Sequence, residues 1–178
     1  MLILASHRKN LGFSLIELMV AVALFGVLAS LAIPAYRDMI QNNQIRNAAE
    51  SIQTGIQLAR AEAVKRNTTV QFILNGTNSA WCVSTGTTCP GTIQNRVVGE
   101  GSSTSVTVTP TPAGSLVFNS LGILTSPTPT AGSGFVELGV DHSTTGTGLR
   151  NLRVVVGIGG SSKMCDSALA STDVRSCP

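Results

Sequence analysis

The strongest constraint on this chain is an apolar run of 21 residues, 13–33, in which Glu17 is the only charged residue. A helix rises ~1.5 Å per residue, so a run of this length can cross a hydrocarbon layer of ~30 Å. Arg8 and Lys9 precede the run. Because basic flanking residues are retained in the cytoplasm, the sequence predicts a cytoplasmic N-terminus and an exported remainder.

The apolar run differs from a cleaved secretory signal. Such a signal has a shorter apolar core, and its small-residue cleavage site follows that core. Here the candidate junction, Gly12-Phe13, precedes the run, so cleavage there would leave the helix on the mature chain. Glu17 then needs an explanation, because a charge inside an apolar segment is costly unless it is neutralised. A local explanation is a capping box, S-x-x-E, formed by Ser14 and Glu17 at the start of the helix.

The helical pattern continues beyond the apolar run as far as Arg66. Pro34 predicts a kink and not an end, because the pattern resumes directly after it. From Ile45 onward, apolar residues recur at steps of three and four and form one stripe on an otherwise polar helix. The stripe consists of Ile45, Ala48, Ala49, Ile52, Ile56, Ala59 and Ala63. A stripe of this kind requires a partner surface.

Beyond Asn67 the apolar period changes to two, which is typical of β-strands. Residues 70–74 and 80–84 flank Asn75-Gly76 and predict a hairpin. Further strands are predicted at 106–109, 116–118, 135–140 and 152–156, with loops such as 125–134 between them. An antiparallel sheet can cover the helical stripe with one face and meet water with the other. The predicted fold class is therefore α+β.

Composition indicates the compartment and gives no support for a strongly charged partner. Of the 12 Lys and Arg residues, Arg8 and Lys9 precede the apolar run, which leaves 10 against 9 acidic residues from Phe13 onward. Net charge therefore indicates neither a nucleic-acid nor an anionic-membrane ligand. Charged residues make up only 12% of the chain and aromatic residues 4%, which resembles exported β-rich domains.

Four cysteines support an oxidising compartment. Their spacing matches no C-x-x-C redox or zinc pattern, and two local disulfides are the best interpretation, although sequence allows three pairings. The cysteines are Cys82, Cys89, Cys165 and Cys177. A Cys165–Cys177 bond would tie the last dozen residues to the sheet, and a Cys82–Cys89 bond would close the loop after the Trp81 strand.

No motif indicates an enzyme. The segment GIGGSSK, 157–163, resembles a phosphate-binding loop, but Met164 stands where Ser or Thr is required and no periodic helix follows. His142 lies between Asp141 and Ser143, and adjacent residues cannot normally form the successive hydrogen bonds of a triad. No His, Cys and carboxylate cluster has metal-ligand spacing. The sequence therefore predicts no catalytic residue, no metal and no cofactor.

The stretch GFSLIELMVAVALFGVLASLAIPAY, 12–36, resembles the prepilin signature of type IV pilins and pseudopilins. That signature has a short basic leader, Gly before the cut, Phe as the new N-terminus, Glu at its fifth position and a Pro near the twenty-second. The matching residues are Gly12, Phe13, Glu17 and Pro34. Residues 42–70 resemble the GspH/FimT branch of minor pilins, whose helix ends in a phrase like ARxEAVKR. The resemblance extends to WCV at 81–83 and LVFNSLG at 116–122. It becomes weaker after Gly122.

The resemblance implies a pilin-like fold with four regions. These are a cytoplasmic leader, 1–12; a transmembrane and filament-core half of a long kinked helix, 13–36; an amphipathic half, 37–66; and an extracytoplasmic β-rich head, 67–178. A prepilin peptidase would cut between Gly12 and Phe13 and methylate the amine of Phe13. Glu17 would then pair with the N-terminal amine of a neighbouring subunit and select one register of packing.

The resemblance also implies partners and locations. The partners would be the prepilin peptidase, other minor and major pilins contacted through the N-terminal helix, the inner-membrane assembly platform and, before assembly, the membrane. The chain would cross the inner membrane once, with its head in the periplasm, and then enter a pilus or pseudopilus.

Three functions stay open on sequence grounds. Pro34 and the phrase QLARAEAVKRN, 57–67, favour a minor pilin at or near a pilus tip that helps to initiate assembly. A minor pseudopilin of a type II secretion system, contacting exported proteins, would have much the same fold.

The third function is DNA binding for transformation. Some FimT-branch members use a G-R-x-R loop for it, but the corresponding place here, 159–166, keeps only Lys163. The candidate phosphate contacts are Arg150, Arg153, Lys163 and Arg175. They would form at most a weak, salt-sensitive patch, because Asp141, Asp166 and Asp173 oppose them.

Overall fold

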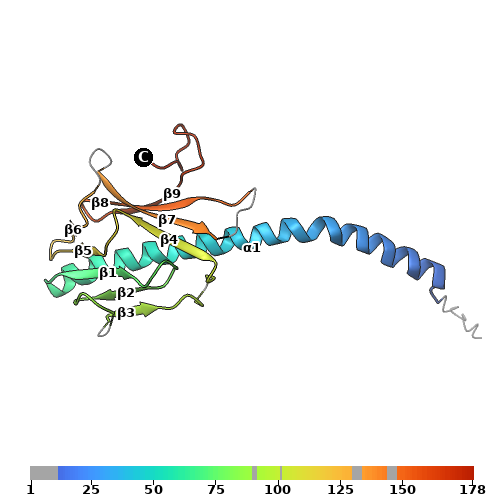
Figure 1. The fold of residues 1–178 in the computed structure, drawn as a ribbon, viewed down its shortest axis with the longest axis horizontal. Helices are drawn as coiled ribbons and strands as arrows, with labels where there is room; N and C mark the ends of the chain where they lie inside the picture. Colours follow the sequence, from blue (N-terminus) through green and yellow to red (C-terminus); the bar gives the residue numbers. More distant parts are fainter. Residues whose placement is uncertain (1–11, 90–91, 101, 130–133, 144–147) are drawn as a thin grey trace, which may run out of the picture. The chain divides into compact units, whose positions relative to one another are not determined.

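The computed structural model describes residues 12–178 except 90–91, 101, 130–133 and 144–147 (Figure 1). The chain divides into two compact units, Met1–Arg37 and Asp38–Pro178. Of the expected leader, only Gly12 lies within the described residues.

One long helix, α1 (Leu15–Arg66), begins and ends with recognisable caps. At its start, the Glu17 N–H donates to Ser14 Oγ at 3.2 Å, which satisfies one of the unpaired amides of the first turn. At its end, Asn67 has a φ of 50°, and the Thr68 N–H donates to the Ala63 carbonyl at 3.2 Å, as in a Schellman motif. The helical assignment passes through Pro34 without a break, so Pro34 does not end the helix. The kink expected there stays a prediction.

The amphipathic part of α1 forms the centre of the head core. All seven residues of the predicted stripe are fully buried, so that prediction is confirmed. Strand residues from both sheets of the head pack in the same core cluster, among them Phe72, Trp81, Val140 and Val154. The apolar stripe and the strands therefore bury each other, which is the main source of stability for such a helix.

Two antiparallel sheets cover this helix (Figure 1). The first has the order β3-β2-β1-β5-β6 and consists of β1 (Val70–Leu74), β2 (Trp81–Ser84), β3 (Gln94–Arg96), β5 (Leu116–Phe118) and β6 (Leu124–Ser126). The second has the order β4-β7-β8-β9 and consists of β4 (Val106–Thr111), β7 (Phe135–His142), β8 (Leu152–Gly157) and β9 (Ser162–Asp166).

The head therefore differs in detail from the single sheet expected from sequence. Main-chain hydrogen bonds join the two sheets at two places, from Val108 to Thr77 at 2.8 Å and from Leu124 to Ile158 at 2.9 Å. The six predicted strands are present, with small differences at their ends. Three strands were missed, β3, β6 and β9, and β6 overlaps the start of the segment expected to be a loop.

A close contact between α1 and the first sheet surrounds Trp81. The indole N–H donates to Ser51 Oγ at 2.8 Å inside the core, and the Phe72 ring lies 5.6 Å from the Trp81 ring, centroid to centroid. Gly55, one turn after Ser51, permits this approach, because a Cβ there would lie 2.7 Å from the Phe72 ring. Ser51 and Gly55 together form the contact surface of α1 on which Trp81 packs.

Candidate assembly site and head surface

The expected cleavage junction lies outside regular structure. Gly12, Phe13 and Ser14 precede α1, and all three are exposed. Apart from its chain neighbours, no described residue has a heavy atom within 4 Å of the position that a Cβ on Gly12 would take. Exposed, irregular backbone is where proteases act most readily. The geometry therefore leaves the Gly12-Phe13 bond accessible.

The first half of α1 exposes an apolar surface. Its large apolar side chains are all at least half exposed, whereas a water-soluble surface rarely collects so many in one place. Among the described residues α1 is the one helix long and apolar enough to cross a membrane, judged by length and composition, with a mean hydropathy of 2.4 in its most apolar window. This surface needs either lipid or other apolar helices around it.

Glu17 lies in the first turn of this apolar segment. The hydrogen bond to Ser14 Oγ engages the main-chain amide of Glu17 and not its carboxylate, and the side chain is exposed. An acidic residue in the first turn also interacts favourably with the positive end of the helix dipole. Capping and an ion pair with another chain are therefore compatible, because they use different atoms of the same residue.

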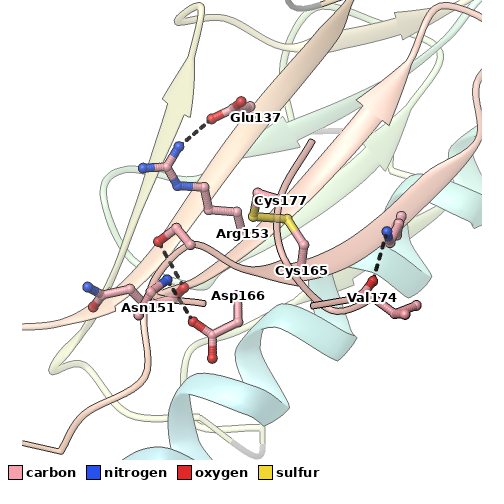
Figure 2. Close-up of a disulfide and its surroundings, with 10 residues drawn as sticks. Glu137, Asn151, Arg153, Cys165, Asp166, Val174 and Cys177 are labelled. Atoms are coloured by element: carbon pink, nitrogen blue, oxygen red, sulfur yellow. Dashed lines mark hydrogen bonds and ion pairs between the residues drawn. A yellow bond between two sulfur atoms is a disulfide. The ribbon is translucent and has the colours of Figure 1, made fainter. Parts of the chain in front are cut away.

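Two disulfides stabilise the head. Of the three pairings that four cysteines allow, the structure contains the local one, Cys82–Cys89 and Cys165–Cys177. Cys82 lies on β2 and its bond closes the loop that follows this strand. Cys165 lies on β9, and its bond holds the C-terminal segment against the second sheet (Figure 2).

Two of the four candidate phosphate contacts lie on the outer face of the second sheet. Arg153 is opposite Cys165 in the β8–β9 register, and Lys163 is opposite Val155, two residues from Arg153 along β8. Arg153 Nη1 is 2.7 Å from Glu137 Oε2, and Lys163 Nζ donates to the Val174 carbonyl at 3.5 Å (Figure 2). Both cations are therefore engaged within the head.

The other two candidates, Arg150 and Arg175, line a depression of about 230 Å³ together with Arg46 of α1. Arg175 is paired with Asp173 at 2.9 Å; this contact lowers the pKa of Asp173 to about 2 and raises the pKa of Arg175. The main-chain N–H of Arg150 donates to Asn42 Oδ1 at 2.9 Å. The structure thus separates the four basic residues into two places. Sequence reasoning missed Arg46, which is four residues before its ion-pair partner Glu50 and resembled an ordinary surface charge.

The remaining sequence motifs have structural roles. The glycine-rich segment connects β8 to β9 as a hairpin, in which the Gly160 N–H donates to the Gly157 carbonyl at 2.8 Å. His142 is at the end of β7 opposite Val106 on β4. Among the described residues there is no group of three or more His, Cys, Asp or Glu side chains that could hold a metal ion.

Comparison with family models gives two matches. Residues 48–160, more than half of the chain, match the family described as type II transport protein GspH. Residues 7–33 match the prokaryotic N-terminal methylation motif, which includes Gly12, Phe13 and Glu17. The two matches cover the apolar segment and most of the head.

Curated relatives are filament proteins. The type IV major fimbrial protein FimA of Dichelobacter nodosus is 32% identical over 99 residues, covering 56% of this chain and 52% of the relative. A fimbrial protein of Moraxella nonliquefaciens is 44% identical over 52 residues, covering 28% of this chain and 34% of the relative. The chain thus spans about half, or less, of the length of these relatives.

Solved structures support the same fold. The type IV minor pilin FimU of Pseudomonas aeruginosa matches with a TM-score of 0.57 at 16% identity, covering 74% of this chain and 95% of FimU. A second crystal form matches with a TM-score of 0.51 at 17% identity, covering 72% of this chain and 98% of FimU. Pilins and pseudopilins are structural proteins and not enzymes. The chain therefore belongs to the GspH family and is a type IV pilin-like protein with an N-terminal methylation motif.

Proposed function

We propose that this chain is a minor pilin of a type IV pilus, incorporated at or near the tip, where it helps to initiate assembly. The observation that carries the proposal is the contrast along α1. The stripe from Ile45 to Ala63 is fully buried in the chain's own head, whereas the apolar side chains of the first half are exposed and require other apolar neighbours.

Processing would prepare the helix for assembly. A prepilin peptidase on the cytoplasmic side would cut the exposed Gly12-Phe13 bond and methylate the new amine of Phe13, in keeping with the match to the methylation motif. Before this step the helix would cross the inner membrane once, with the head in the periplasm. Afterwards the helix would leave the bilayer laterally and pack among the helices of other pilins, with the help of an inner-membrane assembly platform.

Glu17 would set the register of this packing. Its carboxylate would pair with the N-terminal amine of a neighbouring subunit, in a surrounding of apolar helices with little water. An unpaired charge in such a place is strongly unfavourable, so registers that leave Glu17 or the amine without a partner are disfavoured. The pair therefore contributes specificity more than stability.

A substitution at Glu17 tests this proposal. In Glu17→Ala, the recovery of the processed chain in sheared pili should fall at least about tenfold, which corresponds to the loss of ~1.4 kcal/mol or more of assembly free energy. Total cellular levels should stay unchanged, because the side chain is exposed in the isolated subunit. Glu50→Ala, which removes an exposed carboxylate from the head part of α1, is the control and should assemble normally. Equal recovery of Glu17→Ala and the unsubstituted chain would show that the pairing role is wrong.

A minor pseudopilin of a type II secretion system is the second candidate, favoured by the description of the matching family as a type II transport protein. Deletion of the gene separates the two. Loss of twitching or DNA uptake with normal exoprotein secretion supports the pilus, and the reverse result supports the secretion system. DNA binding by the head has less support, because Arg153 and Arg175 are engaged in ion pairs.

A further inference from the structure

An exposed apolar patch lies at the end of the head farthest along α1 from Asp38. Val64, Leu121, Ile123 and Ile158 expose 52%, 74%, 38% and 53% of their surfaces. They come from the last turns of α1, the β5–β6 turn and the β8–β9 turn, which lie at the same end of the head in Figure 1. We call these four residues and Arg60 the distal patch.

Two contacts show that the distal patch is continuous. The Leu124 N–H donates to the Ile158 carbonyl at 2.9 Å, which joins the β5–β6 region to the β8–β9 turn. A Cβ on Gly122 would lie 3.1 Å from Val64 Cγ2, which brings the β5–β6 turn against α1. Apolar side chains from three segments are thus held next to each other on folded elements.

Arg60 lies within this apolar surface. A Cβ on Gly160 would lie 3.0 Å from Arg60 Cδ, and one on Gly122 would lie 3.2 Å from Arg60 Cγ, so the arginine side chain crosses both glycines. Both glycines have a positive φ, 73° at Gly122 and 75° at Gly160. A Cβ on Gly160 would also clash with the Gly122 carbonyl. Larger residues are therefore excluded from the surface on which Arg60 lies.

Arg60 has no neutralising carboxylate among the described residues of the head. Four other arginines have carboxylate partners within 3.0 Å: Arg46, Arg66, Arg153 and Arg175. Arg60 has no ion pair with any residue that the structure describes. An arginine framed by exposed apolar side chains has the composition of an interface centre, where arginine is enriched and aliphatic neighbours exclude water.

We propose that the distal patch docks a second, different pilin-family subunit, which presents a carboxylate flanked by apolar side chains. This inference rests on the proposed function. The carboxylate would pair with Arg60, and the apolar side chains would cover Leu121 and Ile158. Charge complementarity supports this partner chemistry, because apolar side chains that covered Arg60 without an opposite charge would leave it buried and unpaired.

The class of the partner follows from the N-terminal helix. Residues 7–33 match the N-terminal methylation motif, and the chain is similar to fimbrial proteins, 44% identical over 52 residues in one case. Helices that pack side by side in one direction place the heads of different subunits at successive heights. The neighbours of this head in a filament would therefore be the heads of other pilin-family subunits.

Photo-crosslinking in cells tests the proposal with the full chain. A photoreactive residue at Leu121 should form a link to a peptide of another pilin-family protein that contains Asp or Glu, identified by mass spectrometry. The same residue at Val97 is the control; this side chain is 55% exposed and follows β3, at the opposite edge of the sheet from β6. Links from Leu121 only to a second copy of this chain, to lipid or to a protein of another class would overturn the proposal, as would equal yields from both positions.

Charge and polarity variants give a second readout. Leu121→Asp and Arg60→Glu should each lower recovery in sheared pili at least about tenfold, whereas Val97→Asp should change it less than about twofold. Reversing the sign of the linked carboxylate in the partner should restore assembly of Arg60→Glu. Normal assembly of both patch variants while Glu17→Ala fails would overturn the docking surface alone. If the unsubstituted chain is absent from sheared pili, the proposed function itself is wrong.

Discussion

At the scale of single residues, the core depends on a polar contact inside an apolar surrounding. Trp81 donates its indole N–H to Ser51 Oγ at 2.8 Å, and Gly55 leaves room for the rings of Trp81 and Phe72. A buried indole N–H without an acceptor is unfavourable, because water no longer satisfies it. Ser51 is therefore part of the packing of the first sheet on α1, although serine is a weak helix former.

Ser51→Ala should lower the free energy of unfolding by about 1–3 kcal/mol, because it leaves the Trp81 N–H buried and unpaired. Thr54→Ala is the matched control: its hydroxyl donates to the Glu50 carbonyl on the exposed side of the same helix, and we expect a change within about 0.5 kcal/mol. Trp81 is the only tryptophan, so denaturant unfolding followed by its fluorescence measures both variants. An equally small effect at both positions would contradict the role of Ser51.

Residue patterns predicted the buried stripe of α1 but not the contact of Trp81 with Ser51 and Gly55. Ile45 and its six partners recur with helical spacing, and that spacing alone identifies a buried face. Ser51 and Gly55 are small residues that the pattern treats as neutral. Their role depends on β1 and β2, which bring Phe72 and Trp81 to the helix, and no local signal in the sequence encodes that contact.

At the scale of elements, the strands that sequence reasoning missed share one position. β3 and β6 are the two edges of the first sheet, and β9 is an edge of the second. Edge strands are short and polar in soluble proteins because this limits pairing with other chains, so they lack the alternation that reveals central strands. QNR in β3 and SKMCD in β9 illustrate this. The hydrophobic period predicts edge strands only where they alternate, as β4 does, and misses short polar edges such as β3.

The bond between Cys165 and Cys177 fastens one of these edges. It links β9 to the C-terminal segment. On the neighbouring strand β8, Val155 lies opposite Lys163 and is buried. Replacing both cysteines by serine should cost about 3 kcal/mol of stability, from the loop entropy of a 12-residue separation. Val174→Ala, in the same segment but 89% exposed, should change stability by less than about 0.5 kcal/mol. Thermal unfolding without reductant measures the difference, and an unreduced peptide digest in which Cys165 and Cys177 are linked to other cysteines would contradict it.

At the scale of the whole molecule, the chain combines a head that buries its own core with a helical segment that cannot remain in water. The head supplies its own partner for the amphipathic part of α1, but the large apolar side chains from Phe13 to Ile33 are exposed among the residues that the structure describes. The prepilin-like signature predicted the family. That cleavage, membrane insertion and packing act on this one short stretch stays a prediction. The head surface was less predictable, since ion pairs such as Arg153 with Glu137 form only when the sheet is folded.

Cleavage of the leader should determine whether the apolar segment stays in the membrane or packs in a filament. Gly12→Leu should block cleavage, so that the chain keeps its leader, stays in the membrane fraction and is absent from sheared pili. The leader would carry Arg8 and Lys9 into a packed apolar bundle, which is strongly unfavourable, and no free Phe13 amine would exist to pair with Glu17. The substitution should not disturb folding, because a Cβ at Gly12 meets no heavy atom within 4 Å.

Gly99→Leu is the matched control for this experiment, since a Cβ there also meets no heavy atom within 4 Å. We expect this variant to be processed and assembled normally. The intact mass of each chain measures cleavage directly, because a processed chain would lack residues 1–12 and carry one added methyl group. A Gly12→Leu chain that retains its leader and still enters sheared pili at the normal level would mean that a free N-terminus is not required, and pairing through Glu17 could then not set the register.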